Sequence, residues 1–279
     1  MGVGELSSWS GKLSLAFDCL QGKTVLRRQE ASLPLAFQKP LYPEGPGHCH
    51  GIILHPPGGI ANDDELHVVV DLQDNAQVLL TSPGAMKIYR SAVQASQLVE
   101  IQVADGAYLE WLPQETILFN GARWRQHTRI DLAAKARWLG WDIIRFGRTA
   151  AGERFTEGHW QSATEVWRGE EPLWIDRQQL QGGSPLLDSE FGLRGEAVVA
   201  SLIWIGQALP RELLEDCRQW WQSQNWQGEA GVSRLPDGLV ARYRGPSTAE
   251  ARSWFTVIWN HLRQHALQRP ACLPRVWNT

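Results

Sequence analysis

The sequence contains few cysteines, and none of them belongs to a paired motif. Its 279 residues include four widely separated cysteines without a CxxC pair, so neither a zinc site nor a dithiol redox site is indicated. Isolated cysteines are usual in reducing compartments, and we therefore expect a cytoplasmic protein without disulfides. The four are Cys19, Cys49, Cys217 and Cys272.

Long apolar runs are also missing. The longest, from Ala197 to Ile205, includes Ser201 and is too short to cross a bilayer. The first residues show no basic region followed by an apolar segment, and Leu6 stands where a myristoylation signal requires Ser or Thr. We therefore expect no membrane attachment and no secretion.

Neither sign of charge dominates, and lysine is scarce. The 27 Lys and Arg residues nearly balance the 30 Asp and Glu residues, and only five of the 27 are lysines. The formal net charge of −3 gives no general attraction for nucleic acid. Because arginine is favoured at protein interfaces, its excess points to protein partners. With 43% hydrophobic residues and 15 tryptophans, the chain can bury a large core.

Two common catalytic motifs are incomplete. The segment Gly22-Lys23-Thr24 resembles the end of a phosphate-binding loop, but Phe17 occupies the position of the required glycine. The sequence around Gly182-Gly183-Ser184 does not form the GxSxG elbow of serine hydrolases. The sequence therefore supports neither a nucleotide site of this kind nor serine hydrolase chemistry.

Strand segments dominate from Leu13 to about Val199. Short runs of β-branched and aromatic residues alternate with turn residues at intervals typical of antiparallel all-β domains. Two dipeptides, Asp74-Asn75 and Asp105-Gly106, predict tight turns that bring a strand back beside the preceding one. The expected strands cover residues 66–72, 77–81, 97–103, 107–112, 124–132, 137–146 and 197–205.

The periodicity becomes helical after Pro210, a residue that suits the first turn of a helix. A second helix is expected after Ser247 and Glu250, which have the spacing of a capping box, and Pro270 ends it. The predicted fold is therefore mainly β, in one domain over residues 1–279, with a body of many short strands at about 10–206 and 230–245 and helices at about 210–222 and 248–268.

Each predicted helix carries tryptophans on its apolar stripe. Amphipathic helices usually bury such a stripe against their own protein, so core packing is the simpler interpretation. A partner-binding surface is the alternative, because aromatic residues are enriched at interfaces. The tryptophans concerned are Trp220, Trp221, Trp254 and Trp259.

The segment from His48 to His55 holds the most suggestive metal ligands. His48, Cys49, His50 and His55 supply imidazole and thiolate donors of the kind that bind nickel, copper or zinc. Along an extended chain, His48 and His50 would share one face and Cys49 would lie on the other, so convergence requires a turn. An ordinary loop beside a buried thiol is the plainer interpretation.

Three turn segments have restricted backbones. The first, residues 55–60, contains two prolines and two glycines, and the second, residues 81–90, delivers Lys87 together with a tyrosine and an arginine. Glu110 and Glu115 flank the third turn at Pro113. Each turn is compatible with either a scaffold loop or a functional loop.

These segments together resemble the urease accessory protein family UreD, also called UreH. The resemblance covers almost the whole chain, with several long motifs in the same order. It departs from the family pattern at Asn62 and Asp63, where two glycines are usual before the aspartate aligned with Asp64. The matching segments are residues 49–64, 81–91, 109–115, 140–142, 147–148 with 152–153, and 274–277.

The resemblance implies an assembly factor that is not itself an enzyme. Such a protein would bind UreF and, through UreF, the GTPase UreG, and the complex would dock on apo-urease to support nickel insertion. The implied fold is a mainly β, helix-like stack of strands with a pair of α-helices. The family is also associated with an internal passage for nickel, so no cofactor is expected to be firmly bound and nickel would be in transit.

A passage needs donors that replace part of the hydration shell of an ion and then release it. The resemblance suggests Asp64, Thr81, Glu110 and Glu115 as lining groups, with Lys87 in the same motif set. Cys49, His50 and His55 would form a transient metal stop.

The predicted helices, with Trp220, Trp221, Trp254 and Trp259, would offer a surface to UreF. Two other functions remain open at the level of the sequence. One is a metal-dependent enzyme that uses the cluster from His48 to His55, and the other is a β-rich carbohydrate or ligand binder that uses surface tryptophans.

Overall fold

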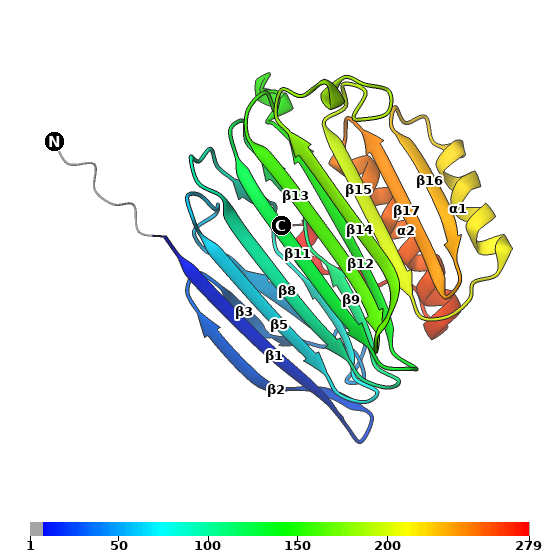
Figure 1. Cartoon of the computed structure of the whole chain (residues 1–279). Coiled ribbons are helices and arrows are strands. Elements are labelled where there is room, and N and C mark those ends of the chain that lie inside the picture. The colour runs from blue at the N-terminus through cyan, green and yellow to red at the C-terminus, as the bar shows by residue number, and fades with distance from the viewer. Residues whose placement is uncertain (1–7, 279) are drawn as a thin grey trace.

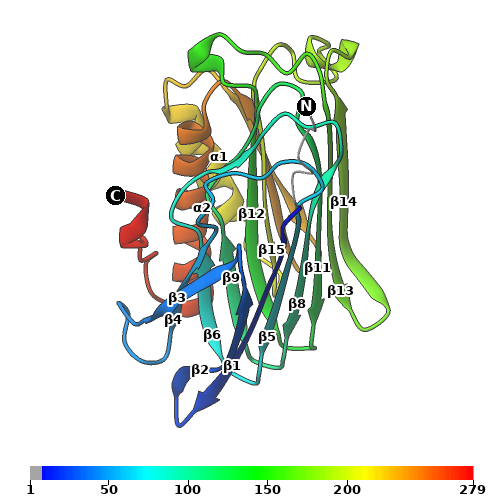
Figure 2. The ribbon, with the colours of Figure 1, turned by 90° about the vertical axis from the view of Figure 1, so that its left-hand side faces the viewer.

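Two β-sheets face each other, and two helices cover the outer face of one of them (Figures 1 and 2). The computed structural model describes residues 8–278, within which seven strands form sheet A and ten form sheet B. In spatial order, sheet A contains β14 (Glu171–Gln181), β13 (His159–Arg168), β11 (Arg123–Leu132), β8 (Ala95–Val103), β5 (Glu65–Leu72), β1 (Ser10–Leu20) and β2 (Lys23–Ser32).

Sheet B carries the helices. Three short 3-10 helices lie at Thr149–Ala151, Pro185–Leu187 and Arg275–Asn278. In spatial order, sheet B contains β16 (Glu229–Leu235), β17 (Gly238–Gly245), β15 (Val198–Ile205), β12 (Arg137–Phe146), β9 (Tyr108–Leu112), β6 (Gln77–Thr81), β4 (Cys49–Leu54) and β3 (Ala36–Leu41), while β10 (Thr116–Leu118) pairs with β12 and with β7 (Met86–Ile88).

The seven strands that were predicted by range lie in the correct places, but their pairing was predicted wrongly. The turn at Asp74-Asn75 joins β5 of sheet A to β6 of sheet B, and Asp105-Gly106 likewise joins β8 to β9. The chain thus winds from sheet to sheet, and successive windings pair in parallel, as β5 with β8 and β6 with β9. This winding confirms a stack of strands and excludes the two expected hairpins.

The two turns are corners that stack on each other. Asn75 and Gly106 have left-handed φ angles of 62° and 69°, and the Asn75 N–H donates to the Asp105 carbonyl at 3.0 Å. Each corner is followed by a buried alanine, Ala76 or Ala107. The turn chemistry was therefore recognised, but period-two alternation is the same whether a strand returns to its own sheet or crosses to the facing one.

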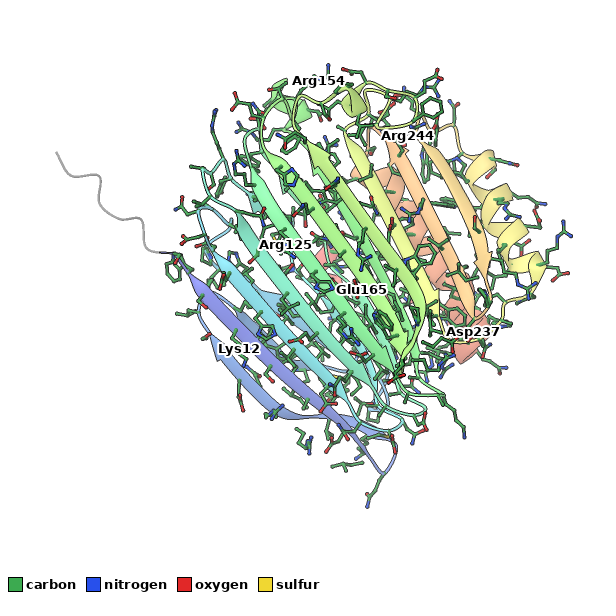
Figure 3. All side chains as sticks on the ribbon, in the orientation of Figure 1. Lys12, Arg125, Arg154, Glu165, Asp237 and Arg244 are labelled. Carbon is green, nitrogen blue, oxygen red and sulfur yellow. The ribbon has the colours of Figure 1, made fainter. Side chains whose placement is uncertain are left out.

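Burial differs between the sheets because only sheet B is covered on both sides. Along β5, buried and partly exposed residues alternate, and the outer face of sheet A presents polar side chains such as Lys12, Arg125 and Glu165 (Figure 3). Along β12, most residues are buried because the helices cover the face turned away from sheet A. One apolar core therefore lies between the sheets and a second between sheet B and the helices.

The helices agree with prediction to within one residue. They are α1 (Arg211–Ser223) and α2 (Thr248–Leu267), and the Ser247 hydroxyl caps α2 by accepting from the Glu250 N–H at 3.3 Å. No helix in the described part of the chain is long and apolar enough to cross a membrane.

The tryptophans of α2 do not form an exposed surface. Trp254 and Trp259 are fully buried between α2 and sheet B, so their assignment to a partner surface was wrong. The apolar stripe of α2 lies flat on the sheet, as amphipathicity alone favours. Trp220 and Trp221 of α1 are half-buried and pack against Trp226, which leaves part of this aromatic cluster accessible.

Candidate functional site

A buried ion cluster lies on the helix-facing side of sheet B. Glu110 of β9 and Arg263 of α2 are both fully buried, and the Arg263 Nε lies 3.2 Å from the Glu110 Oε1. The same Oε1 accepts hydrogen bonds from the Trp259 indole at 2.6 Å and the Tyr108 hydroxyl at 3.0 Å. On its other side, the Arg263 guanidinium contacts both carboxylate oxygens of Glu44, at 2.8 and 2.9 Å.

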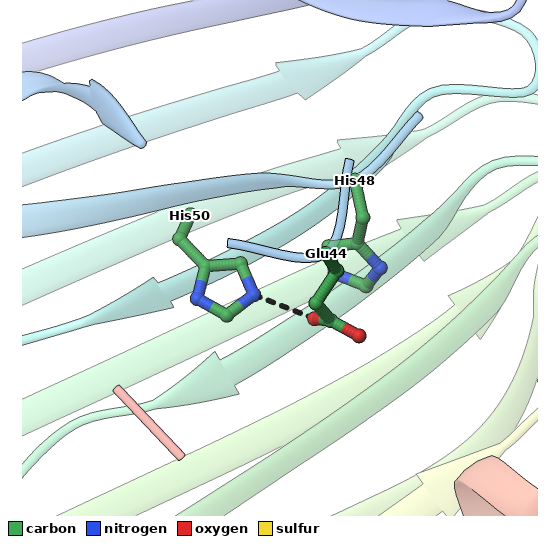
Figure 4. A group of neighbouring side chains, drawn as sticks. All are labelled: Glu44, His48 and His50. Carbon is green, nitrogen blue, oxygen red and sulfur yellow. Dashed lines mark hydrogen bonds and ion pairs between the residues drawn. The ribbon is translucent and has the colours of Figure 1, made fainter. Parts of the chain in front are cut away.

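Two histidines complete the buried ion cluster. The His50 Nε2 lies 2.7 Å from the Glu44 Oε1, as Figure 4 shows. His48 lies between Arg263, whose Nη2 is 3.3 Å from its Nδ1, and Glu110, whose Oε2 is 3.5 Å from its Nε2. All of these groups are buried or nearly so, and together they join β9, α2, β4 and the segment that precedes β4.

The composition of this cluster is that of a metal site. Ligand atoms of Glu44, His48 and His50 lie within 4.8 Å of one another, and this is the only such group of three among residues 8–278. However, the Arg263 Nη2 contacts both Glu44 and His48, so a protein cation already neutralises the carboxylate. We therefore interpret the cluster as a structural ion-pair network.

The carboxylates of the cluster remain ionised although they are buried. Burial alone would raise the pKa of Glu110, but hydrogen bonding from His48 and the charge of Arg263 outweigh burial and lower it. Burial also acts on Glu44, where hydrogen bonds from His50 and Arg263 lower the pKa to about 2. Each negative charge thus has a partner within the protein.

A second polar region, the intersheet cavity, lies between the two sheets. The cavity has a volume of about 100 Å³, which is enough for several water molecules because one water needs only about 10–15 Å³ by this measure. Its polar lining consists mainly of amides and hydroxyls from both sheets, including Gln97, Gln126, Thr128, Thr164, Gln178 and Ser201.

Two carboxylates also line the intersheet cavity, Asp142 from β12 and Asp176 from β14. Burial raises the pKa of Asp142 to about 7, and the negative charge of Asp176 adds to this effect. The hydrogen bond from the Gln126 amide acts in the opposite direction but is weaker. The accessible surface of Asp142 faces the cavity, where its carboxylate lacks the resident cation that Glu110 has.

The four residues expected to line a passage are distributed over different sites. Thr81 borders the intersheet cavity, where its hydroxyl donates to the Leu112 carbonyl at 2.6 Å and accepts from the Trp277 indole at 2.8 Å. Asp64 instead accepts the Trp9 and Ala61 N–H groups at 2.8 and 3.0 Å, which fixes the loop before β5. Asn62 adopts a left-handed φ of 54°, so asparagine fulfils one of the glycine positions.

The remaining two expected lining residues make ion pairs. Glu110 belongs to the buried ion cluster, and Glu115 pairs with Arg252 of α2. Neither residue borders the cavity. Lys87 is exposed on β7, where its main-chain carbonyl accepts the Ile60 N–H at 2.8 Å.

The three rigid turns do converge. The Tyr89 N–H donates to the Ile60 carbonyl at 2.8 Å, which joins the first turn segment to the second. The Met86 N–H donates to the Glu115 carbonyl at 2.9 Å, which joins the second segment to the third. These main-chain contacts give the three turns a common scaffold role.

The residues expected to form a transient metal stop are not brought together. Cys49 points into the core between the sheets, and burial raises the pKa of its thiol to about 12. His50 lies on the opposite face, as alternation predicted, and belongs to the buried ion cluster. His55 is half-buried near Asp64, and burial lowers its pKa. Only His50 is placed among other ligand-type side chains.

The sequence argument missed several residues of both polar regions. Arg263 lies four residues after Trp259 on the buried stripe of α2, and this unexpected charge was the available signal. Asp142 and Asp176 are likewise charged residues within strands, but only contact with the facing sheet reveals their shared cavity. Glu44 stands in a loop and gave no signal.

The sequence matches one family of known proteins over nearly its whole length. The family profile described as UreD urease accessory protein matches residues 10–278. A protein of Nostoc punctiforme is 50% identical over 270 residues, covering 96% of both chains, and one of Nostoc sp. is 48% identical over 275 residues, covering 98% of both.

A more distant relative comes from Dechloromonas aromatica, with 45% identity over 276 residues that cover 98% of this chain and 95% of the relative. All three relatives carry the name urease accessory protein UreD. Because both the family profile and these relatives match nearly the whole chain, the protein belongs to the UreD family of urease accessory proteins.

Proposed function

We propose that this protein is a cytoplasmic urease maturation factor that supports nickel insertion into apo-urease without catalysing a reaction itself. The match of the UreD family over residues 10–278 carries the proposal. The relatives are named as accessory proteins, which fits a role in assembling another enzyme. In this role nickel is cargo, and the protein needs no resident cofactor.

We further propose that the intersheet cavity is a nickel passage. Amides and hydroxyls can replace part of the hydration shell of an ion while still letting it leave, which a conduit requires. Gln126, Thr128 and Ser201 offer such donors, and Asp142 adds a carboxylate. The buried ion cluster is a poorer route because Arg263 would repel a divalent ion.

The proposed partners are UreF, the GTPase UreG and apo-urease. The best remaining candidate for the UreF surface is the accessible part of the aromatic cluster at the end of α1, formed by Trp220 and Trp221 of the helix and Trp226 after it. A metal-dependent enzyme built on residues 48–55 is less well supported, since Cys49 and His50 lie on opposite faces and Arg263 occupies the cation position. The glycan-binding alternative loses Trp254 and Trp259, which are fully buried.

The test is urease activation in cells that produce urease and lack this chain. Activity and nickel content of urease should fall strongly, and the intact gene should restore both. Affinity purification of the tagged chain should recover UreF, UreG and apo-urease together. Normal nickel loading without the chain, or substrate turnover by the purified chain alone, would contradict the proposal.

A further inference from the structure

A second hollow, the edge cleft, opens at one side of the sandwich. It lies where β14 of sheet A approaches β15, β16 and β17 of sheet B, and its volume is about 720 Å³. Gln178 and Ser201 line both the edge cleft and the intersheet cavity. These shared residues place the two hollows next to each other, on either side of Gln178 and Ser201.

One ion pair stands at the boundary between the two hollows. Asp176 lines the intersheet cavity, Arg242 lines the edge cleft, and the Arg242 Nη2 lies 2.9 Å from the Asp176 Oδ2. The Gln178 amide donates to the same Oδ2 at 3.0 Å and to the Ser201 hydroxyl at 3.4 Å. The Arg242–Asp176 pair therefore links the linings of the two hollows.

Arg242 differs from the arginine of the buried ion cluster in its access to water. Its side chain is 46% exposed, whereas that of Arg263 is fully buried. A half-exposed guanidinium can leave its carboxylate partner and move into solvent at little cost in free energy, because water then solvates its charge. Its partner Asp176 is only 12% exposed and stays at the cavity wall, together with Asp142.

We propose that the Arg242–Asp176 ion pair is the gate between the edge cleft and the intersheet cavity. A divalent cation that enters the cavity takes the place of the guanidinium beside Asp176, and Arg242 swings into the cleft. The resident charge of Arg242 keeps the empty cavity nearly neutral and excludes weakly bound monovalent cations. This inference rests on the proposed passage and adds to it an entrance and a selecting residue.

The test measures binding of Ni²⁺ alone to the purified full chain by titration calorimetry and stopped-flow mixing. Arg242→Gln removes the competing charge, so the Asp176-dependent Kd should fall about threefold or more at low ionic strength, and added NaCl should reduce the difference. Asp176→Asn shows how much of the Ni²⁺ affinity depends on Asp176. The double variant, Arg242→Gln with Asp176→Asn, should lose the increase in affinity that Arg242→Gln alone produces.

Arg177→Gln is the matched control. Arg177 neighbours Asp176 on β14 and also lines the edge cleft, but it pairs with Glu165 and not with Asp176. Its loss therefore removes a charge from the cleft while the Arg242–Asp176 pair remains. Arg242→Met provides a second neutral variant if Arg242→Gln unfolds. Equal Ni²⁺ affinities and association rates in Arg242→Gln, Arg242→Met and Arg177→Gln would overturn the gate.

Urease activation separates the gate from the proposed function. If Arg242→Gln tightens Ni²⁺ binding but both it and Asp176→Asn activate urease normally, the cavity binds cations without being the passage, and the gate fails with it. If deletion of the chain abolishes activation while no Arg242 variant changes Ni²⁺ binding, the maturation role stands and the gate alone fails.

Discussion

Glu110 and Asp142 are buried carboxylates on neighbouring strands of sheet B, yet their pKa values shift in opposite directions. Glu110 faces α2 and receives a guanidinium, an indole and a phenol. Asp142 faces sheet A, where it has one amide donor, Gln126, and a second carboxylate nearby. Burial is common to both, so the difference comes from what each carboxylate contacts.

This difference distinguishes a carboxylate whose charge is paired within the fold, Glu110, from one that is available to an ion, Asp142. The buried ion cluster supplies its own cation, and a metal ion would have to compete with Arg263 in a closed space. The intersheet cavity contains space, neutral donors and a carboxylate that lacks a resident cation. A ligand-type side chain can take up an ion more readily where the protein supplies no cation for it, which is why the passage is proposed at the intersheet cavity.

The sharpest way to break the comparison is Glu110→Gln. Glu44 still pairs with Arg263 in this variant, so the loss comes from the hydrogen bonds to the Glu110 carboxylate. A hydrogen bond to a charged group contributes about 1.5–3 kcal/mol, so the free energy of unfolding should fall by about 3 kcal/mol. Urea denaturation measures the loss. Glu115→Gln is the control, because its pair with Arg252 is partly exposed and should contribute about 1 kcal/mol or less. Similar losses in both variants would show that burial of the Glu110 pair is unimportant.

Acid should destabilise the region of the buried ion cluster before the rest of the fold. The pKa of Glu44 is lowered to about 2 and that of Glu110 is also lowered, so both stabilise the fold fully above their ordinary pKa values. The stability should be lost as the pH falls from about 4.5 toward 2, by about 2–3 kcal/mol for Glu44. Denaturation at a series of pH values measures the slope, and Glu44→Gln should flatten it. An unchanged slope in that variant would contradict the assignment.

The variant Asp142→Asn should change the free energy of unfolding in the opposite direction and by a smaller amount. The folded pKa of about 7 exceeds the ordinary value of 3.8, so the folded state retains a proton that the unfolded state loses. Asp142 should therefore reduce stability as the pH rises from about 4 to 7, and Asp142→Asn should be more stable by about 1–2 kcal/mol at pH 8. Thermal unfolding at pH 5 and pH 8 tests this, because the gain in stability of Asp142→Asn should be larger at pH 8. An equal gain at both pH values would contradict the raised pKa of Asp142.

Local sequence patterns predicted the elements better than their arrangement. The capping pair Ser247 and Glu250 and the apolar stripe of α2 define a helix within about twenty residues, so its bounds were correct. The turn at Asp105-Gly106 was also recognised, but its direction depends on stacking with the corner at Asn75, thirty residues earlier. Hairpins were predicted because local turn chemistry does not report that contact.

The candidate site depended still more on distant contacts. Alternation along the strand correctly placed Cys49 and His50 on opposite faces, but it could not show that His50 contacts Glu44 in the buried ion cluster. Asp142 and Asp176 come from different sheets and share a cavity only after the sandwich closes. The resemblance to UreD identified the family, whereas the side chains around the cavity required the structure.

The contact between Glu44 and Arg263 spans 219 positions of the chain. During synthesis, Glu44 and Glu110 emerge long before the helix that neutralises them, and the apolar face of sheet B stays uncovered until α2 follows. The nascent protein therefore passes through a stage in which the charged side chains of the future buried ion cluster and a wide apolar surface are exposed to water. Formation of α2 covers the apolar surface of this aggregation-prone intermediate and completes the fold. Chains that terminate before Arg263 should therefore aggregate.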